Sequence, residues 1–213
     1  MKTVSIEDLI RWEACKRYII GSKPTEITLS LFDGRETLST AEVARLDICL
    51  GDRLWVLAHV EIAKAVEFAR TVVEKALNYV WLYTGIKPLD GSWGAVERCR
   101  YSEGTATAAI AAIAGARIDA ATAAATKARD IATTKTTANF YAVYYSARAA
   151  LFVATAYLAY IDYLDYDSYT DVGISVNAIA DAVYAAEDVV LYNIEEERAN
   201  LNVENELKAI FHY

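Results

Sequence analysis

Apolar residues recur at helical spacing along most of the chain, and the first stripe begins close to the N-terminus. Its members are Ile6, Leu9, Ile10, Ala14 and Tyr18. Ser5 followed by Asp8 is a capping-box pattern, which marks where a helix begins. We therefore expect a first helix that runs from these residues to Gly21.

The next stretch carries weaker signals. The short alternation from Thr25 to Leu31 follows Pro24 and predicts an irregular connection that contains at most one short extended piece. Ser39 and Glu42 form a second capping-box pattern. They predict a short helix that ends near Gly51.

A longer helix is predicted from about Asp52 to Tyr83. Its expected apolar face consists of Leu54, Leu57, Val60, Ile62, Val66, Ala69, Val73, Leu77, Val80 and Trp81. Gly85 and Pro88 are typical of a helix end. A small helix should follow around Trp93 to Arg100.

Alanine makes up half of the residues from Thr105 to Ala132. Because alanine has the highest helix propensity, this stretch predicts one helix roughly 42 Å long. Two further long helices are expected, from about Asn139 to Asp162 and from about Ser175 to Asn200, before a short terminal segment.

These elements predict an all-α fold, an antiparallel helical bundle with long alanine-rich helices. We expect one helical domain over residues 1–213. Shorter helices and loops occupy 1–104, and long helices rich in alanine and tyrosine occupy 105–213.

Charge and cysteine content narrow the partners. The chain has 21 basic and 29 acidic residues, a formal net charge of −8, which disfavours binding to polyanionic nucleic acid. Threonines and nearby charges interrupt the most apolar stretches, so we expect no membrane span. Three cysteines without a C-x-x-C pair predict neither a disulfide framework nor a zinc site, and favour the cytoplasm.

No catalytic motif is present in the sequence. The two histidines are His59 and His212, and neither has the sequence neighbours that general-base chemistry requires. We interpret His59 as a histidine of the core or the surface. The chain is therefore expected to be non-enzymatic, without cofactor or metal.

An acidic segment follows the second long helix. Four aspartates could form either a solvated turn or a docking face for a basic protein partner. The EF-hand spacing of ligands is not met, which excludes that type of calcium loop. The four residues are Asp162, Asp165, Asp167 and Asp171.

Tyrosines flank an arginine on the helix predicted over 139–162. Aromatic residues and one arginine recur there at helical steps: Tyr141, Tyr144, Tyr145, Arg148 and Phe152. Tyr141, Tyr145 and Arg148 are the candidate ligand-binding residues, and Arg117 in the alanine-rich stretch could face the same space. Such a set could bind a planar anion such as a nucleotide. Alternatively, the tyrosines fill space that the alanines leave, with Arg148 paired to an acid of a neighbouring helix.

Four segments, in this order, resemble the immunity protein family of the type-five-like kind, which is named from polymorphic toxin systems and also occurs in phage genomes. They are Glu7-Asp8-Leu9 with Ala14-Cys15, Asp52 to Leu57, Phe68-Ala69-Arg70 before Ala76-Leu77, and Ala95 to Gly104. The resemblance implies long alanine-rich helices after an aromatic-x-x-Gly element. It also implies a role in neutralising a toxin.

Two functions are therefore expected from different classes. The first is an immunity or inhibitor protein that binds a protein toxin or defence effector stoichiometrically. The alternative is a small-molecule sponge, of the kind a phage could use, that sequesters a nucleotide signal between helices. A structural helical subunit is a third option, and a homo-oligomer is left open.

Overall fold

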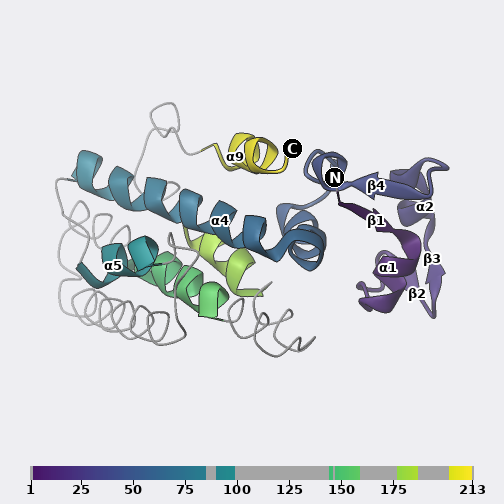
Figure 1. Ribbon diagram of the computed structural model, residues 1–213, viewed down its shortest axis with the longest axis horizontal. Coiled ribbons are helices and arrows are strands. Elements are labelled where there is room, and N and C mark those ends of the chain that lie inside the picture. Colours follow the sequence, from purple (N-terminus) through teal and green to yellow (C-terminus); the bar gives the residue numbers. More distant parts are fainter. Residues whose placement is uncertain are drawn as a thin grey trace, which may run out of the picture.

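The computed structural model describes residues 2–84, 90–98, 144–145, 147–158, 177–186 and 202–212. These residues are mostly helical, which confirms the coarse prediction (Figure 1). Two small antiparallel sheets, each of two strands, accompany the helices near the N-terminus. The sequence pattern did not predict these sheets.

The two sheets belong to an N-terminal module, defined here as residues 2–49. Strand β1 pairs antiparallel with β4, with Val4 opposite Leu38, and β2 pairs antiparallel with β3. The elements are β1 (Thr3–Ser5), α1 (Ile6–Arg11), β2 (Ile19–Ile20), β3 (Lys23–Pro24), α2 (Glu26–Phe32), β4 (Thr37–Ser39) and α3 (Thr40–Val43). Figure 1 shows the module at one end of the molecule.

Helix α1 ends at Arg11, so the prediction of a helix to Gly21 is wrong. The capping box at Ser5 and Asp8 is present as predicted. At the other end, Glu13 has a φ of 55°, in the left-handed region, and an α-helix cannot continue through that conformation. The chain turns there, and Tyr18 becomes buried beyond the turn.

The expectation of an irregular or extended piece over residues 25–31 is also wrong, because α2 occupies them. Thr25 caps this helix, and its hydroxyl accepts from the backbone N–H of Thr28. The Thr28 hydroxyl is buried and donates to the carbonyl oxygen of Tyr18 at 2.7 Å. The Thr25 cap and the contact between Thr28 and the Tyr18 backbone thus stabilise a helix here, although the alternating sequence favours an extended piece.

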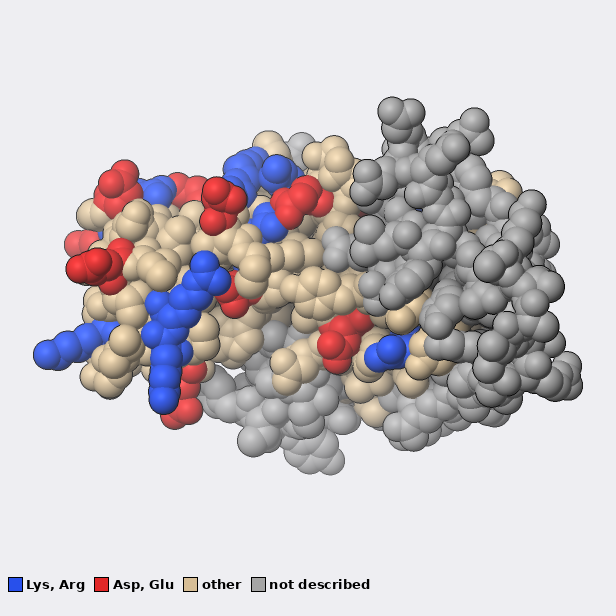
Figure 2. Space-filling view, turned by 180° about the vertical axis from the view of Figure 1, so that it is seen from behind, with Lys and Arg blue, Asp and Glu red and all other residues tan. Residues whose placement is uncertain are grey.

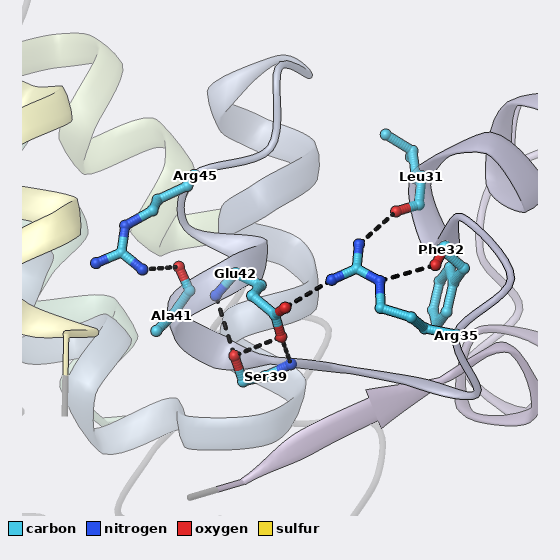
Figure 3. A network of polar contacts seen from close by, with 7 residues as sticks. All are labelled: Leu31, Phe32, Arg35, Ser39, Ala41, Glu42 and Arg45. Atoms are coloured by element: carbon cyan, nitrogen blue, oxygen red, sulfur yellow. Dashed lines mark hydrogen bonds and ion pairs between the residues drawn. The ribbon is translucent and has the colours of Figure 1, made fainter.

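The capping box at Ser39 and Glu42 is present and links two elements of the module (Figure 3). One oxygen of the Glu42 carboxylate accepts from the Ser39 backbone N–H at 2.8 Å and from its hydroxyl at 2.7 Å. The other accepts from Arg35 at 2.6 Å, and Arg35 also donates to the carbonyl oxygen of Phe32 at the end of α2. Helix α3 ends at Val43, before the predicted end near Gly51.

Helix α4 spans Leu50–Thr84 and confirms the long helix expected over residues 52–83. It is broken at Glu61, whose backbone has φ −139° and ψ 61°. A break of this kind interrupts the helical hydrogen bonds, and Lys2 Nζ donates to the carbonyl oxygen of Val60 at 2.9 Å. The module therefore contacts α4 at its break as well as at its start.

Buried side chains from α4 form the centre of the core. The face predicted from periodicity is largely buried, but Trp81 is 49% exposed, which contradicts its assignment to that face. Helix α5 (Asp90–Arg98) and helix α9 (Val203–Ile210) lie on opposite sides of α4 in Figure 1. Three side chains on α9 or just beyond its end are buried: Val203, Leu207 and Phe211.

Residues 147–158 and 177–186 are helical, in agreement with the two long helices expected around them. Most of their alanines are almost fully buried, as at Ala149, Ala154 and Ala182. The helix predicted over residues 105–132 lies outside the described residues, and the antiparallel bundle stays a prediction.

Candidate functional site

A cavity of about 380 Å³ lies between the N-terminal module, the first turns of α4 and the helical segment 177–186. Its lining is mainly apolar and includes Leu9, Phe32 and Val56. Several of the described lining side chains carry a polar group: Glu13, Cys15, Tyr18, Thr28, Asp52, Trp55 and Asn177. A largely apolar hollow with a few polar groups is the usual form of a ligand site.

The turn after α1 places Tyr18 at this cavity. Its backbone N–H donates to the carbonyl oxygen of Cys15 at 2.8 Å, and its own carbonyl accepts from the buried Thr28 hydroxyl. The Tyr18 side chain is only 8% exposed. Hydrogen bonds at the backbone N–H and at the carbonyl oxygen of Tyr18 therefore hold this residue in place, with its side chain buried at the cavity.

The phenol of Tyr18 meets Asp52, which lies in the first turn of α4. The Tyr18 hydroxyl donates to Asp52 Oδ2 at 2.6 Å. Burial raises the pKa of Tyr18, and the hydrogen bond to the Asp52 carboxylate raises it further. The Arg17 guanidinium lies 3.8 Å from the same Oδ2 atom, but both side chains of that pair are partly exposed.

An aromatic cluster adjoins the cavity through Trp55. The rings of Trp55 and His59 have centroids 4.3 Å apart, and Trp12 stacks on His59 at 4.9 Å. His59 Nδ1 lies 2.7 Å from the Trp55 carbonyl oxygen. Burial lowers the pKa of His59, so its neutral form is favoured between these rings. His59 thus packs as an aromatic side chain between two tryptophans.

Close packing also shapes the edge of the cavity near the start of α4, where Gly51 lines it. A Cβ atom added at Gly51 would lie 2.8 Å from the hydroxyl oxygen of Tyr184, on the segment 177–186. Glycine thus lets that tyrosine approach the helix at this point. Because Tyr184 is 43% exposed and can move, we expect a substitution at Gly51 to shift the rim more than the core.

The lining residues are acidic on balance. Glu13 and Asp52 are the charged side chains among the described lining residues, which include no Lys, Arg or His, and the Arg17 guanidinium lies 3.8 Å from Asp52 Oδ2. On the face seen in Figure 2, by contrast, basic and acidic side chains of the described residues are intermixed. With two acidic side chains among its described lining residues, the cavity suits a cationic group better than an anionic one.

Of the Tyr–Arg set predicted from the sequence, the structure describes Tyr145 and Arg148, and both lie outside the cavity. The Arg148 guanidinium stacks on the rings of Tyr144 and Phe152, at 5.6 and 5.5 Å from their centroids. Tyr145 packs partly buried against the core, with its ring centroid 5.3 Å from that of Tyr144. Neither Tyr145 nor Arg148 lines the cavity.

The other predicted site residues cannot be placed. Arg117 and Tyr141 lie outside the described residues, and so do the four aspartates of the acidic segment. Within the part of the chain that the structure describes, no group of three or more His, Cys, Asp or Glu could hold a metal ion. Nor does any helix there combine the length and the apolar character needed to cross a membrane.

Sequence reasoning did not find Tyr18 and Asp52 as a pair. Tyr18 was assigned to the apolar stripe of a helix, and Asp52 to the start of the next long helix. They are 34 residues apart, so no local pattern signals their contact. Comparison of the chain with family models, with curated proteins and with solved structures finds no match.

Proposed function

We propose that this chain is a cytoplasmic, non-enzymatic binding protein of the immunity or inhibitor type, which neutralises a toxin or defence effector by stoichiometric binding. The charge of the described cavity carries the proposal. Glu13 and Asp52 line it beside the rings of Tyr18 and Trp55, and no Lys, Arg or His is among the described lining residues. Such a site attracts a basic group of a protein partner.

The same charge disfavours a nucleotide in this cavity. A phosphate brought near Glu13 and Asp52 would meet like charge in partly desolvated surroundings, where the repulsion is stronger than in water. Nucleotide sites usually provide arginine, lysine or backbone N–H groups for the phosphate. The cavity thus favours the inhibitor over the sponge.

The distribution of charge along the chain supports a basic partner. Residues 159–213 contain twelve Asp or Glu and two Lys or Arg, whereas residues 2–49 contain eight and seven. The acidic excess therefore belongs to the C-terminal part, which includes the four aspartates of the predicted docking segment. Charge of one sign accelerates the encounter with a partner of the opposite sign.

The N-terminal module also exposes large apolar side chains that a partner could cover. Ile20 on β2 is 62% exposed, and Leu29 on α2 is 52% exposed. Ile27 on α2 is exposed as well. Apolar residues at the surface next to a charged site are typical of protein interfaces, which combine an apolar centre with a polar rim.

A second candidate function, the nucleotide sponge, is favoured by one observation. Arg148 lies against two aromatic rings, and none of the ion pairs among the described residues includes it. An arginine that has no acidic partner among the described residues could bind an anion. We place this candidate second because the ligand space that it needs would involve Arg117 and Tyr141, which are not described.

Neutralisation of a captured partner tests the proposed function. The tagged chain is used to capture proteins from its native host, each captured protein is purified, and its toxicity is measured in cells with and without the chain. We expect one captured protein to form a complex of fixed stoichiometry and to lose its toxicity. Failure of every captured protein to form such a complex would contradict the proposal.

A further inference from the structure

We propose that the cavity is the receptor for a lysine side chain carried by the partner protein, with Asp52 as the counter-ion of its ammonium group. This inference rests on the binding function proposed above and specifies the group that is bound. Three observations support it. They are the composition of the lining, the Asp52 Oδ1 atom that no described residue contacts, and the geometry with which a carboxylate binds ammonium and guanidinium groups.

The first feature is the combination of an apolar wall with aromatic rings and acids. The lining combines side chains such as Leu9 and Val56 with the rings of Tyr18 and Trp55. A lysine side chain has the matching composition, because its apolar stem of four carbons ends in a cation. Ammonium groups are attracted to aromatic faces as well as to carboxylates.

The second feature is an available oxygen on Asp52. The Tyr18 hydroxyl and the Arg17 guanidinium both contact Oδ2, at 2.6 and 3.8 Å. No contact among the described residues uses Oδ1. The hydrogen bond from Tyr18 also fixes the orientation of the carboxylate, so Oδ1 is held in place before a ligand arrives. An ordered acceptor costs less entropy on binding than a mobile one.

The third feature selects lysine over arginine. A guanidinium binds a carboxylate best through two parallel hydrogen bonds, which require both oxygens. At Asp52 the Oδ2 atom already accepts from Tyr18 and lies 3.8 Å from Arg17, so a second guanidinium that used both oxygens would compete with these contacts. An ammonium is a compact charge that needs only Oδ1, and the same lining also carries the polar side chains of Glu13 and Asn177.

The existing Arg17 contact does not prevent this binding. The Arg17 side chain is 54% exposed, and that of Asp52 is 29% exposed. Ion pairs with such exposure contribute little to stability, since water and salt screen them. The incoming ammonium can therefore share the carboxylate with Arg17 or displace it.

Titration with small probes tests the inference on the isolated protein. Hexylamine carries the ammonium on an apolar stem, hexanol is its neutral analogue, and hexanoate is its anionic analogue. We expect hexylamine to bind with a Kd on the order of millimolar, as suits a fragment of this size, and at least ten-fold tighter than the other two. Trp55 lines the cavity, so its fluorescence reports occupancy.

Two variants separate the cavity from general charge effects. Asp52→Asn keeps the size of the side chain and removes its charge, and it should weaken hexylamine binding at least ten-fold. Glu26→Gln removes an exposed charge on α2 that does not line the cavity, and it should leave binding unchanged. Equal binding by hexanoate, or equal binding by Asp52→Asn, would overturn the inference.

A measurement on the wild-type chain covers the case in which Asp52→Asn does not fold. In nuclear magnetic resonance spectra, hexylamine should shift the amides of cavity residues such as Gly51 and Asn177. Shifts confined to other parts of the chain would overturn the inference. One further outcome is a partner that the chain neutralises but that does not compete with hexylamine and binds Asp52→Asn with equal affinity. That result would overturn this inference and leave the proposed function intact.

Discussion

Arg53 on α4 and Glu204 on α9 are joined through both terminal nitrogens of the guanidinium, although they are 151 residues apart in the sequence. Arg53 is 5% exposed, and it also donates to the carbonyl oxygen of Ala44, just beyond α3. One buried cation thus ties the N-terminal module, α4 and α9 together. This connection holds the start of α4, and with it Asp52, in a fixed position.

Removal of the Glu204 carboxylate should therefore destabilise the fold. We expect Glu204→Ala to lower the free energy of unfolding by about 1.5–3 kcal/mol, because it leaves the buried Arg53 charge without its acid. Glu206→Ala on the same helix is the control. Its partner Lys75 is 42% exposed, so the loss should be about 0.2–1 kcal/mol. Equal losses in urea unfolding would contradict a special role for Arg53.

Two carboxylates should make stability fall in mild acid. The side-chain hydrogen bond from Arg53 lowers the pKa of Glu204, and the backbone hydrogen bond from Ser39 lowers that of Glu42, both from an ordinary value of 4.5. A lowered pKa in the folded state stabilises the fold above the ordinary pKa, and this stability is lost as the pH falls through the folded value.

We expect the midpoint of urea unfolding to be nearly constant from pH 7 to about pH 5 and to fall below it. Ser39→Ala removes a helix cap and should cost about 1 kcal/mol at pH 7. The variant keeps the backbone N–H of residue 39, which lowers the pKa of Glu42 most, and removes only the hydrogen bond from the hydroxyl, so the loss in acid should become slightly smaller. A larger loss in acid for Ser39→Ala than for wild type would contradict a contribution of the hydroxyl to this pKa.

The Tyr18 phenol should make stability fall at high pH, whereas the two carboxylates make it fall at low pH. Its pKa is raised by burial and by Asp52, so the contribution of this group to stability is present below about pH 10 and is lost as the pH rises further. Tyr18→Phe removes the hydroxyl and should cost about 0.5–1.5 kcal/mol at pH 7. It should also reduce the loss of stability in alkali, which unfolding at pH 7 and pH 10.5 would measure.

Arg148 separates the two candidate functions. We expect Arg148→Ala to lower the free energy of unfolding by about 1 kcal/mol, because the guanidinium loses its contacts with Tyr144 and Phe152. Arg148→Lys, which keeps the charge, should fall between this variant and wild type. Thermal melting of the three proteins measures the order.

The same variants are then titrated with a panel of nucleotides. We expect no saturable binding by wild type. Nucleotide binding that Arg148→Ala weakens about ten- to a hundred-fold, in a variant that melts normally, would place the sponge first.

Local signals explain which parts of the fold could be predicted. The capping boxes at Ser5 and at Ser39 depend on residues three positions apart, so the sequence shows them directly. The long apolar periodicity of α4 is equally visible. The strands were missed because each has two or three residues, too few to show alternation, and the pairing of Val4 with Leu38 is not local.

The candidate site was missed for a related reason. Its polar contact joins Tyr18 to Asp52 across a turn that begins with the left-handed conformation of Glu13. That conformation is rare for a residue other than glycine, and the helical stripe through Tyr18 favoured continuation. Arg148 stacks on Tyr144 and Phe152, two aromatic residues of the same helical stripe, and its role in ligand binding stays a prediction.

Calorimetric titration of the purified partner into wild type and Asp52→Asn tests the central claim most directly. The account predicts a complex of fixed stoichiometry with wild type and with the control Glu26→Gln. It predicts binding at least ten-fold weaker, a loss of about 1.4 kcal/mol or more, for Asp52→Asn in a protein that still melts cooperatively. Equal affinity of wild type and Asp52→Asn for that partner would contradict the account.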